Sequence, residues 1–476
     1  MKTFLHRMAA VVSQLLLTIM PAAAKTGDQE AHDQMSRQIQ ELYNTGNYAG
    51  IHDLLTTGFQ AQFDRAKVEA FFGQVLQPTY GKFDVITFLK KEGASRLYKV
   101  AAEKGVATLS LAVDDQNKIA GMKFVPGDPK AEVKRPLRAE PAHDNALKNA
   151  LDNKVHKAVV DFYRRGATPG LTVGLMSGSE SKIYNYGETV RGGGVLPSGS
   201  TIYEIGSISK TFTSLLLAQA VEEKKIRLDA DVRPLLKGPY PNLEKDGVPI
   251  QVVHLANHTS GLPRLADDLS KQPRYNPLQP YQNYDWAMMS KFLGRVQLKT
   301  VPGTEEEYSN LGAAVLGHAM ESVLGDKYGA LVRDRICSPL GMKDSSLEAV
   351  DPARFAKGYA EKGEETPAWE MGDWAPAGGI RSTVKDMLLY LEAHLHPRSP
   401  TFTKVTEKTW GQGREAVALA WQRTTLKGGD TLVWHNGGTY GFSSFIGFIP
   451  SRDTGIVVLG NSGESVDGLA IQLLKQ

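Results

Sequence analysis

A stretch rich in proline and charged residues runs from Gly127 to Asp144 and interrupts the periodic patterns of apolar residues in this chain. Such a composition supports neither a helix nor a strand and is typical of a boundary between domains. With 476 residues, of which 41% are hydrophobic, the chain can bury more than one core. We therefore predict a small domain over residues 25–127, a linker over 128–144 and a larger domain over 145–476.

The first domain shows helical patterns followed by strand patterns. Apolar residues recur at helical spacing from Gln29 to Gln77, with a candidate helix cap at Asp64. Segments rich in β-forming residues come next, at 83–89, 97–101, 106–113 and 119–125. This order predicts a small α+β domain, whose sheet packs on the helices. The arrangement is similar to cone-shaped modules of the nuclear-transport-factor type and to small domains ahead of exported hydrolases.

The second domain begins and ends with strand patterns. A helical pattern at 145–163 precedes strand patterns at 171–176 and 182–186, and the segment from about 207 to 395 is mainly helical. Strand patterns return at 431–435, 443–448 and 455–459, before a closing helix at 466–474. We therefore predict an α+β fold, in which both ends of the domain form one antiparallel sheet and a helical lobe is inserted between them.

The N-terminus has the three parts of a secretory signal. Lys2 and Arg7 precede an apolar run from Met8 to Met20, and small residues follow up to Ala24. The apolar run is far shorter than the roughly 20 residues that a membrane-spanning helix needs. We predict that residues 1–24 are removed, that the mature chain has no transmembrane span, and that the protein is exported to the periplasm or secreted.

The charge, the cysteine content and the histidine spacing of the chain argue against a nucleic-acid partner, an internal disulfide and a metal site. The formal charge of +3 falls to +1 when Lys2 and Arg7 leave with the signal, so we expect no nucleic-acid partner. Cys337 is the only cysteine, so the chain cannot form an internal disulfide. No pair of histidines has a metal-ligand spacing such as H-E-x-x-H, and we therefore expect neither a metal nor another cofactor.

A serine and a lysine three residues apart, Ser207 and Lys210, begin a long apolar helical pattern. Residues at this spacing share one face of a helix, so the amine can take the proton of the hydroxyl. Two other pairs, Ser179 with Lys182 and Ser382 with Lys385, have the same spacing. The first lies in a turn between strands, and the second is explained by the capping of a helix. We therefore predict that Ser207 is the nucleophile.

A second motif, Tyr308 to Asn310, also stands before a helical pattern. The same Y-x-N spacing occurs at Tyr240 and Tyr281, but there it lies in loops rich in turn-forming residues. A positive charge nearby favours the phenolate form of a tyrosine. Tyr308 is therefore a candidate general base.

A third motif, His435 to Gly438, ends a strand pattern. Glycine at such a place lets a substrate lie along the strand edge without meeting a side chain. The competing triplet that begins at Lys427 is explained by a hairpin turn into the same strand.

In this order, the three motifs resemble the signatures of the penicillin-recognising serine hydrolases. Within these hydrolases, the chain is most similar to the group of class C β-lactamases, D-alanyl-D-alanine carboxypeptidases, D-aminopeptidases and related esterases. The resemblance spans residues 145–476 and includes the phrases at 257–263, 339–344 and 377–380. It implies a catalytic domain of the class C β-lactamase type.

The resemblance also implies a role for each residue of the motifs. Ser207 is expected to be acylated, Lys210 to share its proton, and Tyr308 to act with the lysine as base and then as acid to the leaving group. The substrate-binding residues are expected to be Asn310, which also holds the lysine, His435 and Gly437. The backbone N–H groups of Ser207 and Gly438 match the oxyanion hole.

His435 stands where class C β-lactamases carry a lysine, and a histidine here is typical of the carboxypeptidases and D-aminopeptidases of the group. Because histidine is only partly protonated near neutral pH, binding of a substrate carboxylate is expected to weaken as pH rises. We expect a serine acyl hydrolase that acts on a small molecule or a short D-amino-acid-containing peptide of cell-wall type. The alternatives are a β-lactamase or small-ester hydrolase, and a penicillin-recognising sensor or scaffold that is acylated without turnover.

Overall fold

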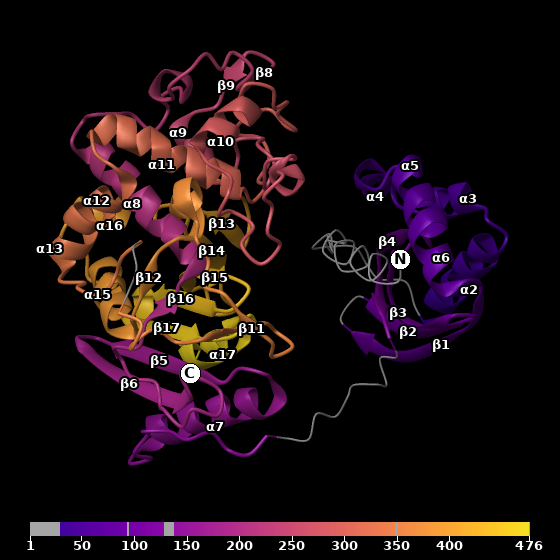
Figure 1. Cartoon of the computed structure of the whole chain (residues 1–476). Coiled ribbons are helices and arrows are strands. Elements are labelled where there is room, and N and C mark those ends of the chain that lie inside the picture. The colour runs from indigo at the N-terminus through magenta and orange to yellow at the C-terminus, as the bar shows by residue number, and fades with distance from the viewer. Residues whose placement is uncertain (1–28, 93–94, 128–137, 348–350, 476) are drawn as a thin grey trace. The chain divides into compact units, whose positions relative to one another are not determined.

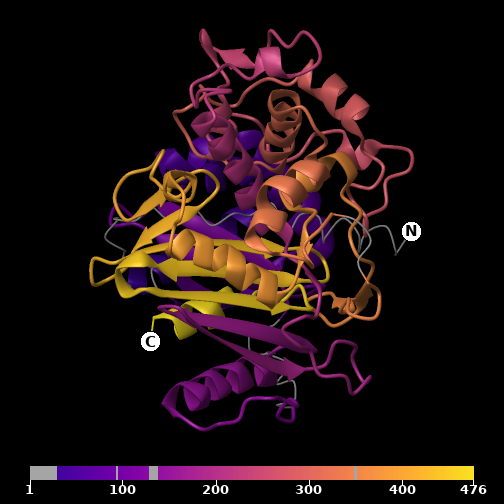
Figure 2. The same cartoon turned by 90° about the vertical axis from the view of Figure 1, so that its left-hand side faces the viewer.

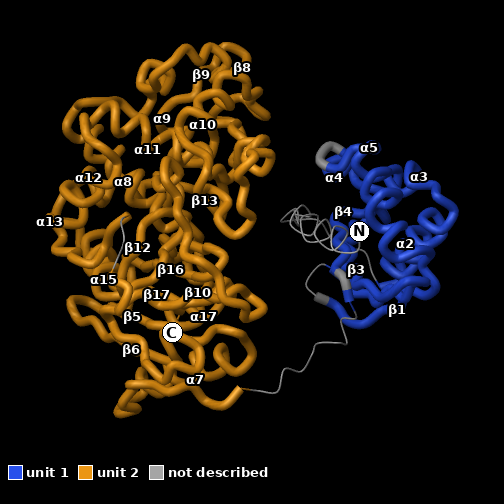
Figure 3. The backbone as a smooth tube through the Cα atoms, viewed as in Figure 1, with its two compact units in different colours: residues 1–136 blue, residues 137–476 orange. Residues whose placement is uncertain are grey.

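The computed structural model describes residues 29–92, 95–127, 138–347 and 351–475 (Figure 1). The chain forms two compact units, residues 1–136 and 137–476 (Figure 3). Their boundary falls within the predicted linker, residues 128–144. The predicted signal segment, residues 1–24, lies outside the described residues.

Unit 1 contains helices followed by a sheet. Its helices are α2 (Gln29–Asn44), α3 (Tyr48–Asp53), α4 (Thr57–Gln62), α5 (Arg65–Glu69), the π-helical turn η1 (Ala70–Leu76) and α6 (Gln77–Tyr80). The antiparallel sheet has the order β1 (Phe83–Glu92), β2 (Ser95–Ala102), β3 (Gly105–Val113) and β4 (Ile119–Pro126). The helices and strands share one apolar core around Ile39, Phe72 and Leu109. The predicted order of helices and strands is confirmed, and Asp64 caps α5 by accepting the N–H of Lys67 at 2.9 Å.

Unit 2 is built on an antiparallel sheet of seven strands. In spatial order these are β13 (Glu415–Val417), β14 (Gln422–Thr425), β15 (Thr431–Gly438), β16 (Ser443–Ile449), β17 (Thr454–Gly460), β5 (Gly170–Ser177) and β6 (Glu180–Gly187). Strands from the end of the chain therefore pair with strands from the beginning of the unit, because β17 lies beside β5. This confirms the prediction of one sheet formed by both ends of the domain.

Helices cover both faces of this sheet. On one face, α7 (Ala150–Arg165) and α17 (Asp467–Leu474) share a core with the strands through Val159, Val458 and Leu469. On the other face lie α15 (Val384–Leu395) and the inserted lobe (Figures 1 and 2). The other main helices of this part are α8 (Ser209–Glu222), α9 (Val252–Ala256), α10 (Trp286–Leu293), α11 (Asn310–Leu324), α12 (Tyr328–Val332), η5 (Arg333–Cys337), α13 (Ser338–Leu340), α14 (Ala375–Gly378) and α16 (Pro400–Lys404).

The first helix of unit 2 begins later than predicted. We expected it to start at Asn145, but α7 starts at Ala150, where Asn149 caps it by accepting the N–H of Asp152 at 2.9 Å. The side chain of Asn145 instead accepts the N–H of Leu147, whose φ of 55° is not helical. The capping chemistry of two asparagines thus moves the start of the helix.

Helix α8 lies at the centre of the lobe. It contacts α11 and α14, and its side chains from Ser209 to Ala218 are buried. From Thr201 to Ala218, Ser207 is the one residue that is not fully buried. In the described ranges, no helix is both long enough and apolar enough to cross a membrane.

Candidate active site

A short strand and a sharp turn position Ser207. Strand β7 (Tyr203–Glu204) pairs with β12 (Arg381–Ser382), and Ile205 donates its N–H to Ile380 at 3.1 Å. Gly206 then turns the chain with a φ of 49°, a conformation that glycine adopts without steric cost. The single 3₁₀ turn η2 (Gly206–Ile208) leads into α8. Ser207 therefore lies at the N-terminal end of a buried helix, where backbone N–H groups favour a negative charge.

Lys210 lies one helical turn further on, with its amine beside Ser207. Its Nζ is 3.0 Å from Ser207 Oγ and donates to the carbonyl oxygen of Ala377 at 2.5 Å. The side chain is 1% exposed. Burial, aided by the positive charge of Arg264, holds the pKa of Lys210 well below its ordinary value. The neutral amine, which can accept a proton, is thereby favoured.

Tyr308 reaches the same serine from the loop before α11. Its hydroxyl shares a hydrogen bond with Ser207, and the centre of its ring is 4.8 Å from Lys210 Nζ. Burial raises the pKa of Tyr308 to about 12, although the charge of Arg264 acts in the opposite direction. Tyr308 is therefore a neutral phenol and not the phenolate that a nearby positive charge favours, because the loss of hydration outweighs that charge.

Two residues that sequence reasoning did not place in the site hold Tyr308. The ring of His258 lies 4.4 Å from the ring of Tyr308, and His258 accepts the N–H of Ser309 at Nδ1 and that of Glu307 at its carbonyl oxygen. Arg264 extends from the neighbouring loop, and its guanidinium lies 4.9 Å from the centre of the Tyr308 ring. Through these contacts His258 supports the loop that carries Tyr308.

The glycines of the third motif bring strand β15 against the nucleophile turn. A side chain at Gly437 would overlap the carbonyl oxygen of Ile205, and one at Gly206 would lie 2.6 Å from the backbone nitrogen of Gly438. Ser444, which pairs with Gly437 across the strands, donates its hydroxyl to Ile205 at 2.8 Å. The predicted pair of oxyanion donors, the N–H groups of Ser207 and Gly438, thus lies on two segments in close contact.

His435 is buried and neutral. Burial is the main cause that lowers the pKa of His435 to about 3, and the proximity of Lys210 adds to it. Its Nδ1 lies 2.5 Å from the carbonyl oxygen of Asn436, so Nδ1 carries the proton and Nε2 offers a lone pair. Nε2 is buried and has no hydrogen-bond partner in the described part of the chain. His435 therefore differs from the partly protonated histidine that its ordinary pKa predicts, because 2% exposure removes most of its hydration.

Asn310 lies at the site but does not hold the lysine as expected. Its amide group donates to the hydroxyl of Tyr281 at 3.0 Å, and its Oδ1 is buried without a hydrogen-bond partner among the described residues. The carbonyl oxygen of Ala377 takes the lysine contact instead. The contact uses a backbone oxygen, so the type of residue at position 377 does not predict it. Ala377 does, however, belong to the phrase at 377–380 that supports the family resemblance.

The two competing serine–lysine pairs lie elsewhere. Ser179 is exposed in the turn between β5 and β6. Ser382 contacts Ser345 at 2.8 Å, and Thr383 caps α15, as the sequence predicts. Lys385 is exposed and donates to Ser200. Neither pair has the buried lysine that distinguishes Lys210.

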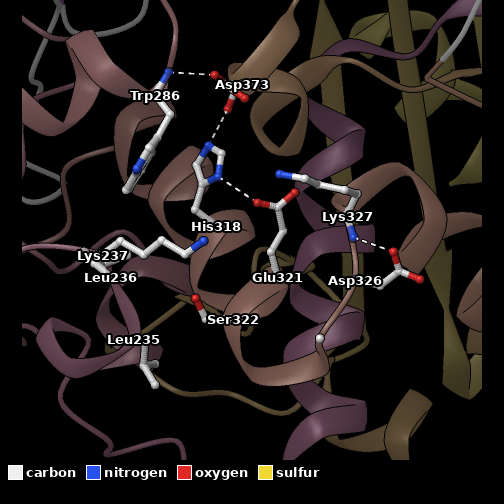
Figure 4. A pocket seen from close by; sticks show the side chains of 11 residues that line it. Leu235, Leu236, Lys237, Trp286, His318, Glu321, Ser322, Asp326, Lys327 and Asp373 are labelled. Atoms are coloured by element: carbon white, nitrogen blue, oxygen red, sulfur yellow. Dashed lines mark hydrogen bonds and ion pairs between the residues drawn. The ribbon is translucent and has the colours of Figure 1, made fainter.

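A separate pocket of about 450 Å³ opens near the C-terminal end of α11 (Figure 4). Inside it, His318 contacts Glu321 at 3.1 Å and the carbonyl oxygen of Asp373 at 3.1 Å. The carboxylate of Asp373 accepts the N–H of Trp286. None of the residues lining this pocket belongs to the predicted catalytic set. The contacts instead fix the segment that leads from Asp373 to Ala377, whose carbonyl oxygen meets Lys210.

Comparisons with known proteins agree with this geometry. The D-alanyl-D-alanine-carboxypeptidase/endopeptidase AmpH of Escherichia coli is 29% identical over 320 residues, which cover 63% of this chain and 80% of that protein. A β-lactamase of Lysobacter lactamgenus is 24% identical over 364 residues, 67% of this chain and 89% of that protein.

Solved structures show the same fold. A class C β-lactamase superposes with a TM-score of 0.60 at 23% identity, covering 68% of this chain and 96% of the other. The D-alanine carboxypeptidase AmpC of Burkholderia cenocepacia gives a TM-score of 0.59 at 22% identity, covering 68% of this chain and 98% of the other. Residues 149–474, more than half of the chain, match the β-lactamase family model. The chain therefore belongs to the β-lactamase family and is a serine hydrolase of this type.

Proposed function

We propose that the protein hydrolyses acyl compounds through an acyl-enzyme on Ser207. The observation that carries this proposal is the contact of Ser207 Oγ with a buried lysine amine at 3.0 Å. A serine hydroxyl needs a base to become a nucleophile near neutral pH, and a lysine deprived of hydration is such a base.

The steps of the reaction follow from the positions of these groups. Ser207 Oγ attacks the carbonyl carbon of the substrate while its proton passes to Lys210 Nζ. The oxyanion that forms accepts hydrogen bonds from the backbone N–H groups of Ser207 and Gly438. Tyr308 is a neutral phenol hydrogen-bonded to Ser207, and it passes its proton to the leaving group as the bond to the carbonyl carbon breaks. Lys210 then gives Tyr308 the proton that it took from Ser207. A water molecule then releases the acyl group by the same route.

The preferred substrates are short D-amino-acid-containing peptides of cell-wall type. The carboxypeptidase names of the relative from Escherichia coli and of the structure from Burkholderia cenocepacia support this choice. His435 supports it too, because a histidine at this position is typical of the carboxypeptidases and D-aminopeptidases that the three motifs resemble.

Efficient β-lactam hydrolysis is the second candidate. It is favoured by relatives that are named β-lactamases, such as the protein of Lysobacter lactamgenus. Hydrolysis of small esters and acylation without turnover use the same first step. We further propose that the protein is exported with removal of residues 1–24, on the strength of the signal pattern alone.

One experiment distinguishes these functions. The mature protein is incubated separately with a chromogenic cephalosporin, a short ester and a D-Ala-D-Ala peptide, and turnover is followed. We expect release of D-alanine from the peptide, slow cephalosporin turnover, and no activity in the Ser207→Ala variant. The Ser179→Ala variant, which alters an exposed serine of the same spacing, serves as the matched control. Fast cephalosporin turnover without peptide cleavage would contradict the preferred substrate class.

A further inference from the structure

Three side chains at the start of unit 2 form a cluster that the hydrolase mechanism does not use. Glu140 and His143 belong to the segment that enters the unit, and His156 lies on α7. One ligand atom from each lies within 4.8 Å of the others. The Nε2 atoms of His156 and His143 are 3.1 Å and 3.9 Å from Glu140 Oε1. Glu140 and His143 are three residues apart but His156 lies on another element, so spacing in the sequence does not reveal the cluster.

These distances suit a transition metal. Zinc binds imidazole nitrogen and carboxylate oxygen at about 2.0–2.2 Å in tetrahedral geometry, which places ligand atoms roughly 3.3 Å apart. The two observed distances to Glu140 Oε1 lie on either side of that value. Two imidazoles and one carboxylate are also a donor set that zinc proteins use, with the fourth position left to water.

The scaffold around the cluster is already ordered. The rings of His143 and His156 meet edge to face, with centres 4.7 Å apart, and both lie against the ring of Tyr186. Tyr186 is fully buried and accepts a hydrogen bond from Asn145 at 2.8 Å. The backbone of His143 also forms a bridge with Tyr186. Little rearrangement is therefore needed to bring the three ligand atoms around one ion.

Exposure and charge at the cluster also permit an ion to bind. The side chains of His143 and His156 are 22% and 18% exposed, and that of Glu140 is 46% exposed, so an ion can enter from solvent. Arg164 lies 3.5 Å from Glu140 Oε2 and leaves Oε1 on the side of the two imidazoles. The Nδ1 atoms of both histidines are buried without a hydrogen-bond partner in the described residues. A hydrogen-bond partner on the second ring nitrogen of a histidine strengthens metal binding, so the lack of one here limits the affinity for the ion.

We propose that Glu140, His143 and His156 bind one divalent transition-metal ion, zinc by preference, and that this ion ties the segment entering unit 2 to α7. The ion takes no part in the Ser207 reaction, because its ligands share no residue with the active site and have no contact with Ser207 among the described interactions. Binding of the ion stabilises the folded unit, since the unfolded chain does not hold the three ligands together.

The test uses the full mature protein after dialysis against a chelator. Zinc binding is measured by calorimetry and native mass spectrometry, and thermal unfolding is recorded with and without zinc. We expect one ion per chain and a higher melting temperature with zinc. The His143→Ala and His156→Ala variants should bind zinc more than about 100-fold more weakly, because losing even a supporting group weakens metal sites about 10–100-fold. The Glu140→Gln variant, which keeps the shape of the side chain, should also bind weakly.

The matched control is His396→Ala, which removes a histidine that also pairs with a carboxylate, that of Asp453. This variant should bind zinc as the wild type does. Circular dichroism and ester hydrolysis show that each variant is folded. Absence of stoichiometric zinc binding to the wild type, or equal binding by a folded variant that lacks both His143 and His156, would overturn the proposal. Either result would leave the proposed hydrolase function untouched.

Discussion

The chemistry of the site is set by burial of individual side chains more than by their identity. Lys210, Tyr308 and His435 are each driven toward the neutral form by loss of hydration. A neutral lysine is a base, a neutral tyrosine is an acid, and a neutral histidine is a hydrogen-bonding group rather than a cation. His435 therefore supplies no positive charge for a substrate carboxylate.

Replacing Lys210 by arginine tests the role of the neutral amine. Arginine fills a similar space beside Ser207 but stays protonated near neutral pH, so it cannot accept the proton of the serine. The rate of acylation, measured by stopped-flow with an activated ester, should fall about 10²–10⁴-fold, as expected for loss of a general base. Lys385→Arg, at the exposed lysine of the third serine–lysine pair, should acylate normally. Equal rates in the two variants would contradict the assignment.

Glu204 makes stability depend on pH. Burial raises its pKa to about 7, although Thr439, the N–H of Trp369 and the charge of Arg381 favour the ionised form. Because its ordinary pKa is 4.5, the folded protein binds more protons than the unfolded chain between these two values. The associated stability is complete below pH 4.5 and is lost as pH rises through about 7.

The Glu204→Gln variant removes this dependence. We measure the free energy of unfolding by urea titration. Between pH 4.5 and pH 8 the wild type should lose up to about 3 kcal/mol of this free energy relative to the variant. Glu180→Gln, at the exposed first residue of β6, is the control and should follow the wild type. Parallel curves for wild type and Glu204→Gln would show that the carboxyl group is ionised at little cost.

The sequence predicts the residues of the site better than their states. The motifs identify Ser207, Lys210 and Tyr308 because side-chain type and order are visible in the sequence, and the structure brings the three together. The contact from Ala377 is made by a backbone oxygen, and the neutral state of Tyr308 depends on burial. Neither can be read from residue type.

Among the elements, strand β15 packs closely against the turn at Gly206. The sequence predicts a strand that ends at His435, yet β15 continues to Gly438 because Gly437 and Gly438 pair with Ser444 and Ser443. Glycine has little tendency to form strands, so the pattern of side chains ends before the hydrogen-bonded strand does. The extra residues bring the strand edge against the nucleophile turn.

A methyl group at Gly437 tests this contact. Its Cβ would overlap the carbonyl oxygen of Ile205 and crowd Ser444, so β15 must move away from the turn. We expect Gly437→Ala to lower the free energy of unfolding by about 1–3 kcal/mol, as overpacking does, and to abolish most ester hydrolysis. Gly428→Ala, in the hairpin turn upstream, meets only Asp430 at 3.9 Å and should leave both quantities unchanged. A fully active Gly437→Ala variant would rule out the need for this close approach.

For the whole molecule, the two units have separate apolar cores. The core of unit 1 lies between its helices and its four-stranded sheet, and those of unit 2 lie on both faces of the seven-stranded sheet. The fold of unit 2 was predictable because strand patterns flank a helical segment. The lengths and paths of the lobe loops were not, because they depend on contacts between distant residues.

Unit 2 should therefore fold and hydrolyse esters without unit 1. A chain of residues 137–476 is expected to unfold in one cooperative transition and to keep the ester-hydrolysis rate of the full protein, because every residue of the proposed mechanism lies in this unit. Calorimetry and a rate assay on the purified fragment give the result. A folded but inactive fragment would mean that unit 1 contributes to the active site.

The central claim is that Ser207 carries the acyl group, and trapping the acyl-enzyme tests it most directly. The mature protein is mixed with a penicillin, quenched in acid, weighed intact by mass spectrometry and then digested. We predict a mass increase of one penicillin per chain, located on the peptide that contains Ser207, with no adduct on the Ser207→Ala variant. An adduct on another residue, or an equal adduct on the Ser207→Ala variant, would contradict the account.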